Sequence, residues 1–165
     1  MLLDMAAEAF GERTAVVCGD DALTFSEVRS AALRAAKKFR DSGAGYVALL
    51  DVNSPALPIA VFGAAYAGIP YVPLNYRLTP EEINALIERV APATLLVGEQ
   101  FEQVVRQRDD VHRLASRDLL EASGEALEPE DVDPASVAVQ LFTSGTTGKP
   151  KAALLRHENL VSYIL

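Results

Sequence analysis

Apolar residues along this chain gather in two kinds of run: short continuous runs, which are typical of buried strands, and longer runs with a helical period. The continuous runs predict strands at 14–18, 22–25, 46–50, 69–74, 94–97, 111–114, 137–142 and 152–155. The helical runs and helix-start signals predict helices at 2–10, 26–41, 55–67, 80–90, 100–107 and 117–122, and one more after residue 156. Strands that alternate with helices predict an α/β fold: a mainly parallel sheet flanked by helices, with hairpins near both ends of the chain.

Three of the predicted helices begin at residues that commonly cap helices. Thr79 and Glu82 have the spacing of a capping box, with a proline at the first helical position between them. Thr24 or Ser26 is expected to cap the second helix, and Ser54 the third. These signals fix where three of the helices should start.

The stretch between Val52 and Tyr76 contains no charged residue, so it has to be weighed as a membrane span. Four prolines interrupt it, and Gly68 divides it into a helix-length half and a strand-length half. A buried helix followed by a buried strand therefore explains the stretch better than a continuous span. Near the N-terminus, Asp4 and Glu8 interrupt the apolar residues, so we expect no secretory signal there.

Composition and charge narrow the possible classes of protein. A chain of 165 residues, half of them hydrophobic, is long enough for one domain or for one large piece of a domain. Its formal net charge of −8 argues against a nucleic-acid partner, which favours a basic face. The basic residues of the second helix are spread opposite its apolar stripe, and we interpret them as its solvated face: Arg29, Arg34, Lys37, Lys38 and Arg40.

The chain has one cysteine, Cys18, which can form no disulfide within the chain. Its apolar neighbours predict a small buried thiol. A chain without an internal disulfide fits a reducing compartment, so we expect a cytoplasmic protein.

The last two predicted strands are joined by a segment rich in glycine and hydroxyl side chains. Its glycines permit turns that expose successive backbone N–H groups in a concave nest suited to an anion. Lys149 and Lys151 supply positive charge, and no acidic residue lies between Asp133 and Glu158. The segment predicts a phosphate-binding loop, and a Gly/Thr-rich surface hairpin is the alternative. It differs from the common P-loop because Pro150, and not Ser or Thr, follows Lys149.

The sequence of this loop closely resembles the phosphate loop of the adenylate-forming superfamily: acyl-CoA synthetases, adenylation domains of peptide synthetases, and luciferases. The matching run is Ser144-Gly145-Thr146-Thr147-Gly148, followed after one position by Pro150-Lys151. The likeness extends over nearly the whole chain, including Asn53-Ser54-Pro55 and the run from Ala64 to Asn75. The resemblance implies that ATP and a carboxylic acid first give an acyl-adenylate and pyrophosphate. A thiol, commonly that of CoA, then takes the acyl group.

The resemblance also implies which residues contact the phosphates of ATP. Lys151 would place a point charge on the leaving pyrophosphate, whereas Lys149, at a variable position of the family, would supply steering charge. The residues expected to wrap the β- and γ-phosphates are Thr143, Ser144, Gly145, Thr146, Thr147 and Gly148. The family's Mg²⁺ ligand and its catalytic lysine lie in later segments, so neither a metal ligand nor a catalytic residue is expected in this chain.

The run Asn75-Tyr76-Arg77-Leu78 has the form typical of acyl-CoA synthetases, since peptide-synthetase domains more often carry an aspartate after the Pro-Leu pair. It favours a fatty or aryl acid, with a fatty acid as the prediction, and CoA as the acceptor. A carrier-protein thiol is the alternative acceptor. The structural interpretation of Asn75 and Arg77 is an Asx-type turn with a surface guanidinium at a helix start, and we also interpret His157 as structural.

The chain departs from the family pattern at Ala152, where glycine is usual, and at Arg156, where a Ser or Thr cap is common. Because family members are several times longer, we interpret residues 1–165 as the N-terminal part of an AMP-binding domain, with an acidic linker at 124–136. This part is expected to be inactive by itself, and its uncovered apolar surface favours self-association. The alternative is a mature non-catalytic module that binds a phosphate or a partner.

Overall fold

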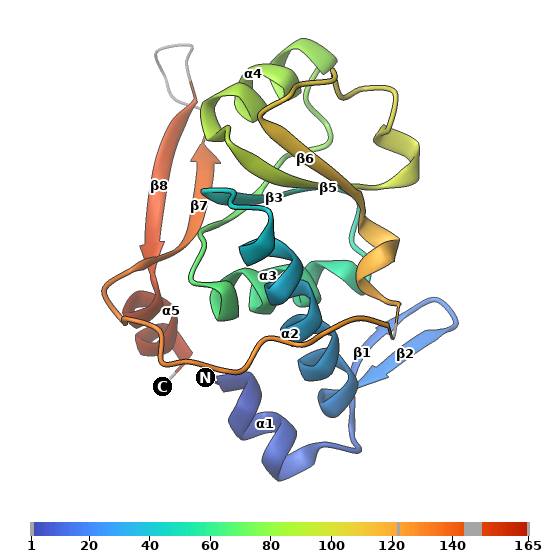
Figure 1. Cartoon of the computed structure of the whole chain (residues 1–165), viewed down its shortest axis with the longest axis vertical. Coiled ribbons are helices and arrows are strands. Elements are labelled where there is room, and N and C mark those ends of the chain that lie inside the picture. The colour runs from blue at the N-terminus through green and yellow to red at the C-terminus, as the bar shows by residue number, and fades with distance from the viewer. Residues whose placement is uncertain (1, 122, 144–149, 165) are drawn as a thin grey trace.

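The computed structural model describes residues 2–121, 123–143 and 150–164, which form the α/β fold shown in Figure 1. Its helices are α1 Leu2–Phe10, α2 Phe25–Asp41, α3 Ala56–Ala67, α4 Pro80–Val90 and α5 His157–Ile164, and its 3-10 turns are η1 Glu99–Phe101 and η2 Ser116–Leu119. Its strands are β1 Thr14–Cys18, β2 Asp21–Thr24, β3 Tyr46–Leu50, β4 Tyr71–Pro73, β5 Ala93–Val97, β6 Val111–Ala115, β7 Val137–Thr143 and β8 Lys151–Arg156.

The central sheet has the strand order β6-β5-β3-β4-β7-β8. All neighbours in it run parallel except β8, which returns antiparallel to β7. The predicted mainly parallel sheet is confirmed, and so are the hairpins near both ends, β1–β2 and β7–β8. Because β3, β4, β5 and β7 are parallel, their carboxyl ends meet at one edge of the sheet, which is where open α/β sheets bind ligands.

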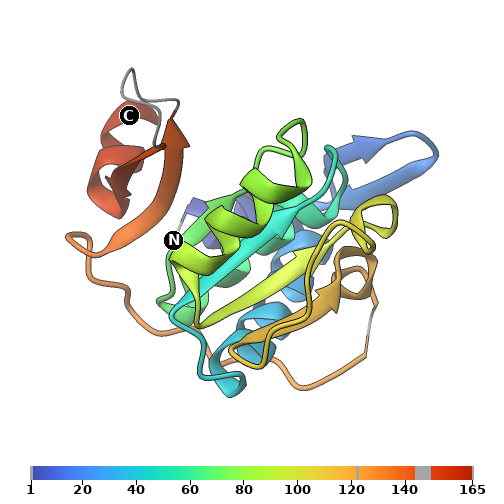
Figure 2. The same cartoon turned by 90° about the horizontal axis from the view of Figure 1, so that it is seen from above.

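Helices cover both faces of the sheet, as Figure 2 shows from above. Successive side chains of β3 pack on opposite faces of the sheet. Val47 and Leu49 belong to the apolar cluster with α2 and α3, and Ala48 and Leu50 to the cluster with α4. A strand that is buried on both faces needs apolar residues at every position. This requirement explains the continuous apolar run from Tyr46 to Leu50.

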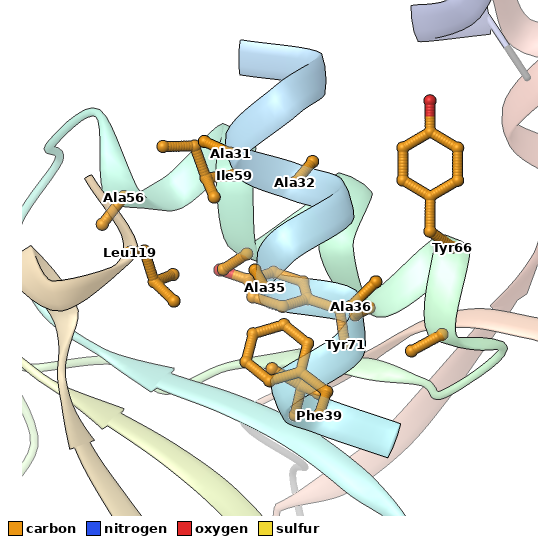
Figure 3. Close-up of a cluster of buried hydrophobic side chains, with 14 of the residues drawn as sticks. Ala31, Ala32, Ala35, Ala36, Phe39, Ala56, Ile59, Tyr66, Tyr71 and Leu119 are labelled. Carbon is orange, nitrogen blue, oxygen red and sulfur yellow. The ribbon is translucent and has the colours of Figure 1, made fainter. Parts of the chain in front are cut away.

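Small side chains let α2 and α3 approach closely. Figure 3 shows Ala32, Ala35 and Ala36 of α2 in one buried cluster with Phe39. A Cβ atom added at Gly63 of α3 would lie 3.0 Å from the Cβ of Ala35 and 3.1 Å from the Phe39 ring.

The charge-free stretch from Val52 to Tyr76 forms the buried helix α3 followed by the buried strand β4, as predicted. In the part of the chain that the structure describes, no helix is long and apolar enough to cross a membrane.

The basic residues of α2 are half-buried rather than fully solvated, and three of them form ion pairs: Arg29, Lys37 and Arg40. Arg29 Nε donates to the Asp4 carboxylate of α1 at 2.7 Å, and Tyr66 of α3 donates its hydroxyl to the same oxygen at 2.7 Å. Arg40 donates to Glu130 at 3.1 Å. These bonds tie α1 and a distant acidic segment to α2.

The acidic segment 124–136 is mostly exposed, and hydrogen bonds attach it to α2. The backbone N–H of Leu127 donates to the carbonyl of Leu33 at 3.0 Å, and the Leu127 side chain packs on the core cluster. Arg40 and Glu130 form a second attachment. The segment therefore runs along the body of the domain before it enters β7.

The prediction of a buried thiol at Cys18 is wrong, because the residue is exposed. Cys18 is the last residue of β1, next to the turn of a two-stranded hairpin that belongs to no larger sheet. An apolar run in such a hairpin has one strand as its neighbour and little to cover it. The continuous apolar run could not distinguish this hairpin from a buried strand.

The predicted helix at 100–107 does not form beyond the short turn η1. The side-chain amide of Asn84 donates to the carbonyl of Val104 at 2.8 Å, and its oxygen accepts from the N–H of Arg106 at 2.9 Å. These bonds engage the backbone groups that a helix would need. Likewise, the helix predicted at 117–122 is reduced to the 3-10 turn η2.

The helix caps behave as predicted at two of three positions. Thr24 caps α2, and Thr79 with Glu82 caps α4, each in a complete capping box. Ser54 does not cap α3, which has no side-chain cap hydrogen bond. Its hydroxyl donates to Asp51 at 3.4 Å instead. The same carboxylate oxygen accepts from the hydroxyl of Ser116, the first residue of η2, and so joins these two loops.

Candidate phosphate-loop site

The strands β7 and β8 bring the two ends of the predicted loop together. Thr143 pairs with Lys151, and Phe142 with Ala152, in the antiparallel register. The hydroxyl of Thr143 also donates to the carbonyl oxygen of Lys151, at 3.4 Å. The remaining predicted loop residues lie outside the described part of the chain: Ser144, Gly145, Thr146, Thr147 and Gly148.

Thr143 and Lys151, the two predicted site residues that the structure describes, are both exposed to solvent. Among the described residues, the Lys151 side chain makes no salt bridge. Its backbone pairs with β7. An ammonium group without a paired carboxylate can bind an anion without first losing a partner. Thr143 adds a hydroxyl beside it, so the two ends of the loop fit the phosphates of a nucleotide.

One further residue reaches this site from α4. Arg89 Nη1 donates to the carbonyl oxygen of Pro150 at 2.8 Å, and its Cζ lies 4.7 Å from the centre of the Phe142 ring. Sequence reasoning missed this contact, because Arg89 and Pro150 are 61 residues apart and nothing near Arg89 distinguishes it from a solvated helix residue. Only the fold brings them together.

Asn75 and Arg77 have the structural roles that we expected. Asn75 Oδ1 accepts the backbone N–H of Arg77 at 3.0 Å, which is an Asx-type turn. The Arg77 guanidinium lies over the ring of Tyr76, with its Cζ 5.1 Å from the centroid. These contacts shape the approach to α4.

The start of α5 uses its backbone and one side chain in place of the usual Ser or Thr cap. Asn159 Oδ1 accepts the N–H of Arg156 at 2.9 Å, and the Arg156 guanidinium donates to the carbonyl of Ala135. The N–H of His157 donates to the carbonyl of Ser136 at 3.2 Å. Burial lowers the pKa of the His157 imidazole, with a smaller opposing effect from Asp133.

The described residues contain no group of three or more His, Cys, Asp or Glu placed to hold a metal ion. The prediction of Mg²⁺ with its ligands elsewhere stays a prediction.

Comparison with protein families identifies the chain. Residues 3–165 match the family model of AMP-binding enzymes. The chain belongs to this family. The match covers every element of the fold from α1 to α5, so the resemblance seen in the loop applies to the whole chain.

Two relatives and one solved structure illustrate the range of this AMP-binding family. The chain is 30% identical to the 3-hydroxybenzoate/4-hydroxybenzoate CoA ligase of Thauera aromatica over 175 residues, covering 94% of this chain and 34% of that protein. It is 30% identical to tyrocidine synthase 3 of Brevibacillus parabrevis over 155 residues, covering 92% of this chain and 2% of that protein. It superimposes on o-succinylbenzoate CoA synthetase (MenE) from Bacillus subtilis with a TM-score of 0.84 at 27% identity, covering 98% of this chain and 34% of that one. The chain thus spans about a third of the length of these CoA ligases.

Proposed function

We propose that this chain is the phosphate-binding part of an ATP-dependent acid–thiol ligase, which joins a carboxylic acid to CoA by way of an acyl-adenylate. The observation that carries the proposal is the antiparallel pairing of Thr143 with Lys151, which makes no salt bridge to any residue that the structure describes. The loop between them has the family's Ser-Gly-Thr-Thr-Gly-x-Pro-Lys sequence. Membership of the AMP-binding family supports the same chemistry.

The first reaction forms a bond between a carboxylate oxygen and the α-phosphorus of ATP and breaks the bond to pyrophosphate. Negative charge therefore increases on the leaving pyrophosphate. The Lys151 ammonium, together with N–H and hydroxyl donors of the loop, would stabilise that charge, each such donor being worth about 2.7–4 kcal/mol at best. Mg²⁺, when bound, would neutralise part of the same charge.

The second reaction transfers the acyl group to a thiol and releases AMP. CoA is the proposed acceptor, because Asn75 stands where peptide-synthetase domains more often carry an aspartate. A carrier-protein thiol is the second candidate, and the likeness to tyrocidine synthase 3 favours it. Thioester formation with CoA or with a carrier protein distinguishes the two.

Two classes of acid are proposed as substrates. The Asn75–Leu78 sequence favours a fatty acid as the substrate, whereas the related hydroxybenzoate CoA ligase is named for an aromatic acid. Both classes fit an acid–thiol ligase of the cytoplasm, which is the proposed location. An acid panel therefore has to contain both.

The test is acid-dependent exchange of pyrophosphate into ATP by the full-length product of the gene, with fatty and aromatic acids. We expect exchange with at least one acid, and we expect Lys151→Ala to slow it by about 10²–10³-fold, the measured effect of removing one transition-state donor. Lys38→Ala, on α2 and far from the loop, is the matched control and should exchange like the wild type.

Three results would contradict this proposal in different ways. No exchange with either acid class, together with a native product of about this length, would favour a non-catalytic module. An unchanged rate in Lys151→Ala would remove that residue from its proposed role. Turnover by the 165-residue chain itself would refute its expected inactivity.

We also propose that the 165-residue chain associates with itself through β8 and α5. Both elements carry exposed apolar side chains, among them Leu154 (55% exposed), Tyr163 (93%) and Ile164 (63%). In the described part of the sheet, β8 is an edge strand with β7 as its neighbour. Exposed edges and apolar patches favour association.

A further inference from the structure

The tip of the β7–β8 hairpin has few attachments to the rest of the sheet. The register between β4 and β7 is the single pair Tyr71–Val139, and β4 ends two residues later, at Pro73. Thr143 lies four positions beyond that pair, and its partner Lys151 is on the edge strand. Sheet pairing with the body of the domain therefore does not by itself fix the direction of the loop ends.

Arg89 supplies an attachment at this point. One guanidinium contacts the ring of Phe142, next to the last residue of β7, and the carbonyl of Pro150, the residue before β8. It thus bridges the chain where it leaves the first strand and where it enters the second. Figure 1 shows α4 beside this end of the hairpin.

The position of Arg89 is itself fixed by the domain core. The next residue, Val90, is fully buried, and Ile87 and Leu86 of the same helix are 1% and 3% exposed. A complete capping box holds the other end of α4. Among the described residues, Arg89 makes no salt bridge that would draw its guanidinium away from the hairpin.

We infer that Arg89 is a positioning residue, which aims the two ends of the phosphate loop by coupling them to α4. It acts through Phe142 and Pro150 and needs no contact with substrate. The kinetic part of this inference rests on the proposed function. Hydrogen-bond donors that stabilise a leaving group lose most of their effect when they are displaced. A misplacement of about 1 Å can cost about 10²-fold in rate.

The first experiment does not depend on catalysis. Amide hydrogen exchange at Thr143 and Lys151 is compared in the full-length wild type, in Arg89→Ala and in Arg13→Ala. Arg13 is a matched control because its guanidinium also lies over an aromatic ring, that of Phe10, with a distance of 5.4 Å at the far end of the chain. We expect loss of protection at the loop ends in Arg89→Ala only. Unchanged protection in Arg89→Ala overturns the inference.

The second experiment separates positioning from general stability. In pyrophosphate exchange, we expect Arg89→Ala to lower kcat/KM for ATP by about 10²-fold and to leave KM for the acid unchanged. Arg89→Lys keeps a cationic donor and should restore part of the loss. Phe142→Leu should lower the exchange rate less in the Arg89→Ala background than in the wild type, because the contact between the ring and the guanidinium is already lost there.

The results distinguish this inference from the proposed function. If the wild type catalyses no exchange with any acid, the proposed function fails, and hydrogen exchange still decides whether Arg89 orders the strand ends. If exchange is present but Arg89→Ala alters KM for ATP and for the acid equally, or lowers only the melting temperature, Arg89 is a structural residue and the inference is wrong.

Discussion

Two buried tyrosines of the same core cluster differ in what their hydroxyl groups contact. Tyr66 and Tyr71 are 1% and 4% exposed, and Figure 3 shows both rings beside the α2 alanines. The Tyr66 hydroxyl donates to Asp4, whereas that of Tyr71 has no partner among the described residues. Burial raises the pKa of both phenols, so both stay protonated donors at ordinary pH.

This contrast predicts opposite effects of the same substitution. A buried polar group without a partner costs about 1–3 kcal/mol, so Tyr71→Phe should leave the free energy of unfolding unchanged or raise it by about 1 kcal/mol. Tyr66→Phe, the matched variant, removes a hydrogen bond to a charged group and should lower it by about 1.5 kcal/mol. Urea denaturation measures both, and a large loss in Tyr71→Phe would reveal a hydrogen-bond partner for its hydroxyl.

At the level of single residues, the sequence predicted contacts only between neighbouring segments of the chain. The pairing of Thr143 with Lys151 follows from two strands joined by one loop, so adjacency along the chain was enough. Arg89 and Asn84 act on backbone far from them in sequence, and nothing in their immediate neighbours marks that role. Such contacts exist only once the helix is placed against the sheet.

Between elements, the contact of α2 with α3 depends on the absence of a side chain at Gly63. Alanine usually stabilises a helix relative to glycine by about 1 kcal/mol. Here the added methyl would press on Ala35 and Phe39 at about 3 Å. We therefore expect Gly63→Ala to destabilise the protein by about 1 kcal/mol, since overpacking costs about 1–3 kcal/mol.

The reverse change at a neighbouring position of α3 is the control. Ala65 is only partly buried, so Ala65→Gly should cost about 1 kcal/mol through helix propensity, as in an ordinary helix. Both variants should therefore unfold at a lower denaturant concentration than the wild type. A stabilised Gly63→Ala protein would show that the two helices can separate without loss.

Helices and strands were predicted well where their own residues carry the signal. They were predicted poorly where contacts with other elements determine the structure. A cap residue predicted the start of α2, a capping box predicted that of α4, and continuous apolar runs predicted β3 and β5, because these signals arise within the element itself. The helix predicted at 100–107 failed because Asn84 of α4 takes up its backbone groups. Cys18 was placed in the interior because the sequence gives no sign that its hairpin stays outside the main sheet.

At the scale of the whole molecule, four of the nine large apolar side chains that are exposed among the described residues lie in β8 and α5. Leu154 lies on the edge strand β8, and Tyr163 and Ile164 lie on α5. Fully burying a leucine side chain is worth about 1.5–3 kcal/mol. A second copy of the chain could gain this free energy by covering the same surface, either edge to edge or face to face.

Sedimentation velocity of the 165-residue chain at increasing concentration should therefore show a shift from monomer to larger species. Leu154→Lys places a charge on the edge strand, a device that blocks strand pairing, and should weaken association by about tenfold or more, as expected for a loss of at least about 1.4 kcal/mol. Val17→Lys is the matched control, because Val17 is also exposed, at 68%, but lies on the separate β1–β2 hairpin. Its association should equal that of the wild type. A wild-type chain that stays monomeric at every concentration, or equal effects of the two lysines, would show that β8 and α5 do not form the contact.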